Sequence, residues 1–363
     1  MFMKPLLVDL ETAWRGGQNQ ALLLLKGLKA RGHQPELIAA HGSALGERAA
    51  AADIRVHHAR RGLLHLPAAM RIRELMRSDG FDLVHANEAH AVSAAWLAGA
   101  HRRVPLIVSR RVGYPIGKSR LARARYEAAT RIVANSRWTA EQAGLSGAPR
   151  SKITVVHEGT EIPQRFTAEQ RNAARKQWRQ PREAPLLGCV GVLLPDKGQE
   201  WLIRALAELY EEFPALRLLL AGDGPCRPRL ERLAKELNVA GSVIFAGFVN
   251  DIDSVYAALD VFLLPSFFEA LNNSLLAAMA REVPSIAFDR GALGEIIENG
   301  RSGLLVPPAN TAALCEAIRA VLRDPAQARC FAEEGRRRVE RDFSADRMVD
   351  EMVQIYDSAL SAG

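Results

Sequence analysis

Short apolar segments alternate with amphipathic segments along the whole chain. Within residues 18–30, for example, Leu22, Leu25 and Leu28 recur at helical spacing and define one apolar side. Such alternation predicts parallel β-sheets with helices on both faces. In the first half, the strands expected are 5–10, 36–40, 81–85, 105–109, 131–135 and 153–157.

The alternation starts again after a polar segment, residues 164–184, which holds an expected helix at 168–178 and then the Pro- and Gln-containing stretch 180–183. We therefore expect an α/β protein with two doubly wound, Rossmann-like domains that face a central cleft at the carboxyl ends of their strands. The strands expected in the second half are 186–190, 216–221, 243–246, 261–264, 285–288 and 303–306. The helices between them are expected to begin near Gln199, Arg227, Ile252, Ser274, Gly294 and Thr311.

Length and composition fit this organisation. The chain has 363 residues, 48% of them hydrophobic, which is enough for two cores. No apolar run approaches the roughly 18 residues of a membrane span, and the first ten residues are too short and acidic for a signal peptide, so we expect a cytoplasmic location. The four cysteines form no C-x-x-C pair and predict buried free thiols rather than zinc or disulfides.

Charge separates the two halves. Residues 1–165 hold 25 lysines and arginines against 13 acidic residues, whereas residues 166–363 hold 23 against 28. Within the first half, residues 102–131 contain nine basic residues and one acidic residue, Glu127. This segment predicts contact with anionic lipid at the inner face of the membrane or with a phosphorylated glycolipid, and a solvated basic face is the alternative. Aromatic residues are not interleaved with the basic ones, so nucleic acid is not expected as a partner.

Two turns after apolar strands are candidates for phosphate binding. Gly16 and Gly17 follow the first strand and open a helix, where backbone N–H groups favour an anion. Lys197 precedes Gly198 after the first strand of the second half, and its ammonium group suits a phosphate. Taken singly, each is equally consistent with an ordinary surface turn. The chain has no G-x-G-x-x-G in this position, which argues against a dinucleotide oxidoreductase.

A third motif, residues 264–280, combines a carboxylate with a helix start. The strand ends at Pro265, Glu269 follows in the loop, and Asn272, Asn273 and Ser274 are residues that favour the N-cap of an apolar helix. A carboxylate above the sheet accepts hydrogen bonds from sugar hydroxyls, and the helix N-terminus holds a diphosphate. One loop would thus bind both the sugar and its leaving group.

In their order and spacing these motifs resemble glycosyltransferase family 4, whose members are retaining enzymes of the GT-B fold. The resemblance covers nearly the whole chain. It is carried by Gly16-Gly17, Gly159, Lys197-Gly198, Gly222-Asp223-Gly224-Pro225, Pro265-Ser266 with Glu269, Ala278-Met279-Ala280, Glu295 and Gly303-Leu304-Leu305-Val306-Pro307.

The resemblance implies a domain division and a donor site. Residues 1–165 would bind the acceptor, residues 166–343 would bind the nucleotide sugar, and a helix within 344–363 would cross back to the first domain. Glu269 would bind the sugar hydroxyls, Lys197 the diphosphate, and Gly17, next to Gly16, would close over them. Backbone amides of Asn272, Asn273 and Ser274 would assist, and the base and ribose would lie near Gly222, Phe248 and Glu295.

The chain departs from the family pattern at several positions. Val192 stands where an arginine is usual, and Ala277 replaces the second glutamate of the family's E-x7-E pair. Glu158 replaces an asparagine in the segment between the domains. Arg110 and Arg111 stand where many relatives have a histidine; they are candidates for contact with an acceptor or a phosphate, with a structural ion pair as the alternative.

The implied reaction is transfer of a hexose-type sugar from a nucleotide-diphosphate donor to a glycan or glycolipid, in lipopolysaccharide or envelope polysaccharide biosynthesis. The leaving diphosphate can take the acceptor proton, so a protein base is optional. No metal-binding cluster and no Asp-x-Asp at a strand end is visible in the sequence, and neither a cofactor nor a metal is expected. His90 is a candidate base, as is Glu88, although capping or packing is the alternative for both; His85 follows the same strand and could also reach the cleft. Asp251 and Asp253 are expected at a helix start rather than at a metal. A nucleotide-sugar 2-epimerase and a non-catalytic nucleotide-sugar-binding relative remain alternatives.

Overall fold

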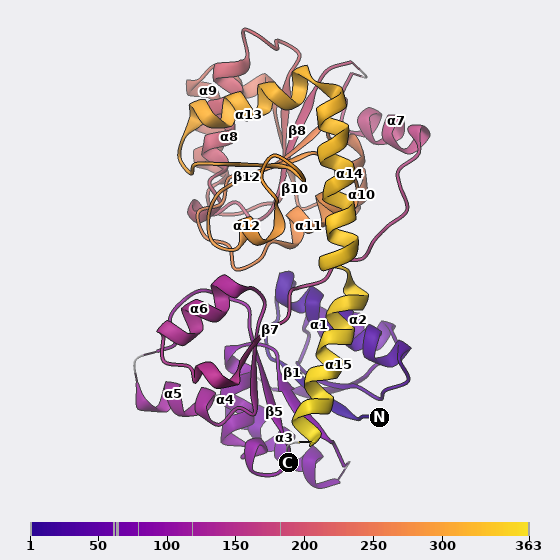
Figure 1. Ribbon diagram of the computed structural model, residues 1–363, viewed down its shortest axis with the longest axis vertical. Coiled ribbons are helices and arrows are strands. Elements are labelled where there is room, and N and C mark those ends of the chain that lie inside the picture. The colour runs from indigo at the N-terminus through magenta and orange to yellow at the C-terminus, as the bar shows by residue number, and fades with distance from the viewer. Residues whose placement is uncertain are drawn as a thin grey trace. The chain divides into compact units, whose positions relative to one another are not determined.

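In the computed structural model the chain forms two compact units, Met1–Gly159 with Phe343–Gly363, and Thr160–Asp342 (Figure 1). The structure describes residues 2–60, 62, 65–78, 80–117, 119–181 and 183–361. Lys118 of the basic segment and Arg182 of the polar segment 164–184 lie outside the described residues. Each unit is described by itself below.

The first unit is built on a seven-stranded parallel sheet with the order β3-β2-β1-β4-β5-β6-β7. β3 was not predicted from the sequence. It is an edge strand whose Arg55 and His58 are exposed, and it therefore lacks an apolar run. The strands are β1 (Pro5–Asp9), β2 (Glu36–Ala40), β3 (Arg55–Ala59), β4 (Leu83–Ala86), β5 (Leu106–Arg110), β6 (Arg131–Ala134) and β7 (Ile153–Val155).

Alternate side chains of each central strand pack on opposite faces of this sheet. Leu6 and Val8 of β1 belong to a core with the helices on one face, whereas Leu7 joins a second core on the other face. Because both faces are covered, the strands read as continuous apolar runs. The first core includes residues of α3 (Leu66–Ser78), α4 (Ala89–Leu97), α5 (Arg120–Glu127) and α6 (Arg137–Leu145), and the second includes residues of α1 (Gly16–Ala30), α2 (Ala44–Ala51) and α15 (Ala345–Ser361).

The last helix, α15, completes the second core of the first unit. Its Val349 and Tyr356 are buried against that core. Arg31, at the end of α1, forms ion pairs with Asp346 and Asp350 of α15 at 3.2 and 2.7 Å. The helix is therefore an integral part of this unit, although it is the last element of the sequence.

The second unit contains a six-stranded parallel sheet with the order β10-β9-β8-β11-β12-β13. Its strands lie close to the predicted ones: β8 (Leu186–Val190), β9 (Arg217–Ala221), β10 (Val243–Gly247), β11 (Val261–Leu264), β12 (Ser285–Phe288) and β13 (Leu304–Val306). The prediction of two doubly wound, Rossmann-like domains is confirmed.

Eight helices are assigned in the described part of the second unit. α14, the longest, was not recognised in the sequence, since its mean composition is polar and only four of its residues are buried. Asp251 caps α10, as expected for a helix start. The helices are α7 (Ala168–Gln177), α8 (Gln199–Leu209), α9 (Arg227–Glu236), α10 (Ile252–Ala258), α11 (Asn273–Ala280), α12 (Leu293–Ile296), α13 (Thr311–Arg323) and α14 (Pro325–Asp342).

All four cysteines are free thiols. Cys189 and Cys315 are buried as expected, but Cys226 is half-buried and Cys330 is exposed, so the expectation of four buried thiols is wrong for these two. Among the helices of the described residues, none combines the length and the apolar character that crossing a bilayer requires.

Candidate functional site

Lys197 and Glu269 meet at the carboxyl edge of the second sheet, at its topological switch point. β8 and β11 are neighbours there, while the chain continues from β8 to one side of the sheet and from β11 to the other. Lys197 follows β8 and Glu269 follows β11, and Lys197 Nζ lies 2.7 Å from Glu269 Oε1. The side chain of Glu269 is only 6% exposed, and that of Lys197 is 26% exposed. The carboxylate is therefore held rigidly, while the ammonium group remains accessible.

The backbone fixes the two loops that carry this pair. Phe267 N donates to Asp196 O at 2.9 Å. Gly198 has φ of +66°, and a Cβ at this position would lie 2.2 Å from the carbonyl oxygen of Pro265. Only glycine allows this approach, so the close contact between the loops requires glycine at position 198.

Helix α11 begins directly beside the ion pair. Asn272 is its N-cap, with Oδ1 accepting a hydrogen bond from Leu275 N at 2.8 Å. The Nδ2 of the same side chain donates to Glu269 Oε1 at 3.0 Å. Asn273 and Ser274 lie in the first turn of α11, where the helix dipole favours an anion. The carboxylate of Glu269 thus contacts both the ammonium group of Lys197 and the N-cap residue of α11.

The other residues of the second unit that were expected to bind the donor lie along the same edge of the sheet. Gly222 follows β9 with φ of +139°, and a Cβ there would lie 2.0 Å from the carbonyl oxygen of Gly191. Phe248 follows β10 and is 74% exposed, and half-buried Glu295 lies on α12, after β12. Because all strands are parallel, these residues share the carboxyl edge with Lys197 and Glu269.

The first unit has its own switch point, between β1 and β4. Gly16 and Gly17 open α1 just after β1, as expected. Asn87, after β4, donates through Nδ2 to Asp9 Oδ2 at 2.7 Å and to Gly17 O at 3.3 Å. Asn87 therefore connects the glycine turn, by hydrogen bonds, to the buried carboxylate of Asp9 in one polar network.

Arg111 belongs to the same network. Its Nη1 lies 3.1 Å from Glu158 Oε1, and its Nη2 donates to Asn87 Oδ1 at 3.1 Å. Arg110 is 7% exposed and donates to Tyr126 OH at 3.4 Å and to the carbonyl of Tyr114. The ion-pair alternative thus describes Arg111, and Arg110 is held in the interior. Contact of either arginine with an acceptor or a phosphate stays a prediction.

His85 lies within β4 and His90 lies on α4, and the two histidines occupy different environments. His85 is fully buried between Tyr356 OH, 2.6 Å from Nδ1, and Ser109 Oγ, 2.8 Å from Nε2, so the expectation that it reaches the open edge is wrong. Burial lowers the pKa of His85 to about 3, and the charge of Arg111 adds to this effect. The side chain of His90 is 55% exposed at the start of α4, and its role as a base stays a prediction.

Glu88 is the N-cap of α4. Its carboxylate accepts hydrogen bonds from Ala91 N at 2.7 Å, from His90 N, and from Leu10 N at 3.2 Å. The capping alternative therefore describes Glu88. The pKa of this carboxyl is raised to about 7, chiefly by burial and also by the charge of Asp9, while the hydrogen bonds from backbone N–H groups oppose the shift.

Comparison with known proteins identifies the family. A model described as "Glycosyltransferase Family 4" matches residues 14–162, and one described as "Glycosyl transferases group 1" matches residues 184–324. A D-inositol 3-phosphate glycosyltransferase of Mycolicibacterium smegmatis is 30% identical over 305 residues, which cover 77% of this chain and 68% of the relative. The chain belongs to the family 4 glycosyltransferases.

Other relatives of this family 4 glycosyltransferase match over less of their length. The lipopolysaccharide core biosynthesis glycosyltransferase LpsE of Rhizobium meliloti is 32% identical over 49% of this chain and 51% of its own. Five further relatives are matched over only 43% to 61% of their own length. The structure of Anabaena Alr3699/HepE in complex with UDP and glucose has a TM-score of 0.87 at 21% identity, covering 98% of this chain and 100% of that one. It shares the GT-B fold.

Proposed function

We propose that this protein is a retaining glycosyltransferase that moves a hexose-type sugar from a nucleotide-diphosphate donor to a glycan or glycolipid acceptor. The observation that carries the proposal is the Lys197–Glu269 pair, 2.7 Å apart, beside the start of α11. The HepE structure, named for its complex with UDP and glucose, supports a nucleotide sugar as the donor. The name of LpsE supports a role in lipopolysaccharide or envelope polysaccharide biosynthesis.

The roles of the site residues follow from their chemistry. Lys197 uses one of its three N–H groups on Glu269 and has two left for a diphosphate. The first turn of α11 adds a second positive end, so charge that develops on the leaving diphosphate is stabilised from two directions. The second oxygen of the Glu269 carboxylate, Oε2, accepts hydrogen bonds from the sugar hydroxyls. The leaving diphosphate takes the acceptor proton, with His90 as the side-chain alternative, and the donor site requires no metal.

Removal of the ammonium group tests this proposal. We expect Lys197→Ala to reduce kcat with a nucleotide-sugar donor by at least 100-fold, because the lost interaction strengthens in the transition state. Lys235→Ala is the matched control, since Lys235 is exposed in the last turn of α9. Transfer should be measured with a panel of nucleotide sugars and lipid-linked or free glycan acceptors. Near-normal turnover of Lys197→Ala would contradict the proposed role.

The same assay separates the alternative functions. A 2-epimerase would convert the donor into its epimer without an acceptor, and NMR of the donor would reveal the change. A non-catalytic relative would bind the donor, raising the melting temperature, without hydrolysis or transfer. Retention is tested by the anomeric configuration of the product.

We further propose that the first unit contacts an anionic lipid surface and receives the acceptor there. Arg102, Arg103, Arg120 and Arg123 are exposed in this unit. Exposed apolar side chains occur in the same segment, with Tyr114 59% and Leu121 49% exposed. Basic side chains next to exposed apolar ones suit the interface of an anionic bilayer.

A further inference from the structure

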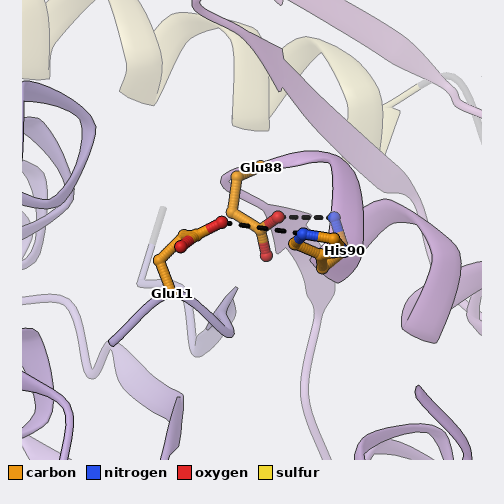
Figure 2. Close-up of side chains that lie close together, drawn as sticks. All are labelled: Glu11, Glu88 and His90. Atoms are coloured by element: carbon orange, nitrogen blue, oxygen red, sulfur yellow. Dashed lines mark hydrogen bonds and ion pairs between the residues drawn. The ribbon is translucent and has the colours of Figure 1, made fainter. Parts of the chain in front are cut away.

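Three metal-binding side chains converge at the switch point of the first sheet. Glu11 lies two residues after β1, and Glu88 and His90 lie where β4 passes into α4. One ligand atom from each lies within 4.8 Å of the others, and His90 Nε2 is 3.7 Å from Glu11 Oε1. Figure 2 shows the two carboxylates and the imidazole ring directed toward one another. Ligands of open α/β sheets bind at the edge where such loops meet.

A second histidine orients the first. His65 Nε2 lies 3.3 Å from His90 Nδ1, and the two rings are 4.9 Å apart. When His90 Nδ1–H donates to His65, the lone pair of His90 is on Nε2, the nitrogen that faces Glu11. Metal-binding histidines generally use their other nitrogen in this way. His65 has φ of +62°, an unfavourable backbone conformation for a residue other than glycine.

The cluster borders a cavity, which leaves room for further ligands. The cavity has a volume of about 270 Å³ and is lined by Glu11, His65 and His90, with Leu10, Ala40 and Ala59 among its other walls. Water molecules or a hydroxyl-bearing ligand in this space can complete the coordination of an ion. Glu88 has coordination capacity as well, because Oε2 accepts a single N–H, from His90.

We propose that Glu11, Glu88 and His90 bind a divalent first-row transition metal ion, with His65 as the positioning residue for His90. Two carboxylate oxygens and one imidazole nitrogen suit Mn²⁺ or Zn²⁺ better than Mg²⁺, which prefers oxygen alone. All residues of this site belong to the first unit, whereas the donor residues Lys197 and Glu269 belong to the second. A metal on Nε2 occupies the lone pair that a base requires, so this role of His90 excludes the catalytic one.

The test is metal binding by the chelator-stripped full chain, without donor or acceptor. We expect one equivalent of Mn²⁺ to bind in an electron paramagnetic resonance titration and Zn²⁺ to compete for it, whereas Mg²⁺ competes poorly. Glu11→Gln and His90→Asn should each weaken Mn²⁺ binding at least tenfold, and His65→Asn should weaken it less, as expected for an orienting residue. Because no transfer is measured, failure of the proposed enzyme activity does not affect the result.

His58→Asn is the matched control. His58 forms a histidine pair with His41, with ring centroids 5.7 Å apart, on the exposed edge strand β3. Unchanged Mn²⁺ affinity in this variant, with loss in the other two, supports the site. The absence of stoichiometric binding, or equal affinity in Glu11→Gln, His90→Asn and the unaltered protein, overturns it. In that case the 3.7 Å contact is a pairing of His90 with Glu11 only.

Discussion

Arg111 and Glu158 illustrate how two departures from a family pattern can compensate each other. Glu158 stands where relatives have an amide, and a cation stands 47 residues earlier, where many have a histidine. The structure places both charges in one buried pair, with side chains 16% and 5% exposed. Asn135 Nδ2 also donates to the same oxygen of Glu158 at 3.1 Å. Neither charge would be tolerated alone at this depth.

We expect Arg111→Met to lower the free energy of unfolding by about 3 kcal/mol or more, because Glu158 is left buried without its cation. The double variant Arg111→Met/Glu158→Met should lose less than the single one. Urea unfolding of the full chain measures both, and the control below. Arg337→Met is a control on an exposed pair, 59% and 54% exposed, and should cost less than about 1 kcal/mol. Equal losses in the single and double variants would contradict the coupling.

His85 predicts how stability depends on pH. Its folded pKa of about 3 lies below the ordinary value of 6.5, so the unfolded chain binds a proton first as the pH falls. The stabilisation from neutral His85 is complete above about pH 6.5 and decreases below it, by at most roughly 1.4 kcal/mol per pH unit. We expect His85→Gln to unfold with a shallower decline between pH 6 and 4. Parallel curves for the two proteins would refute this.

At the scale of elements, the start of α11 combines two functions in one residue. Asn272 caps the helix through Oδ1 and holds Glu269 through Nδ2. The sequence indicates the cap, because asparagine and serine precede an apolar helix. It does not reveal the contact with Glu269, which depends on how the loop turns back over the sheet.

Replacement of Asn272 by alanine should cost about 1 kcal/mol of stability and also weaken donor binding, because Glu269 loses its neighbour. Asn310→Ala is the matched control: Asn310 caps α13 by accepting from Ala313 N at 3.0 Å and has no place in the proposed donor site. Thermal unfolding and the KM for the donor should be measured for both. If Asn310→Ala changed KM as much as Asn272→Ala, the effect would reflect general loosening of the unit.

At the scale of the whole molecule, the excess of basic charge is confined to residues 1–165, and only part of it is available at the surface. Arg110 and Arg111 are committed to interior contacts, whereas Arg120 and Arg123 of α5 are exposed. The charge count alone therefore overstates the surface that an anionic partner would meet.

We expect Arg120→Glu/Arg123→Glu to reduce binding to vesicles containing phosphatidylglycerol by at least about tenfold, since each basic residue near such a surface contributes about 1 kcal/mol. Added salt should weaken binding by the unaltered protein. The reversal Arg232→Glu/Lys235→Glu, on exposed positions of α9 in the second unit, serves as the control. Co-sedimentation that did not depend on anionic lipid would argue against the membrane contact.

The sequence by itself determined the two parallel sheets, because strands buried on both faces must be apolar throughout and helices between them must be amphipathic. It also indicated the glycine turns, Lys197, Glu269 and the N-cap of α11 as candidates for the site. Turns and helix caps depend on local conformation and on spacing along the chain. Tertiary structure alone decided that Arg111 meets Glu158, that His85 meets Tyr356 271 residues away, and that Glu11 meets His90. These contacts depend on strand order and on side-chain direction, which no local pattern records.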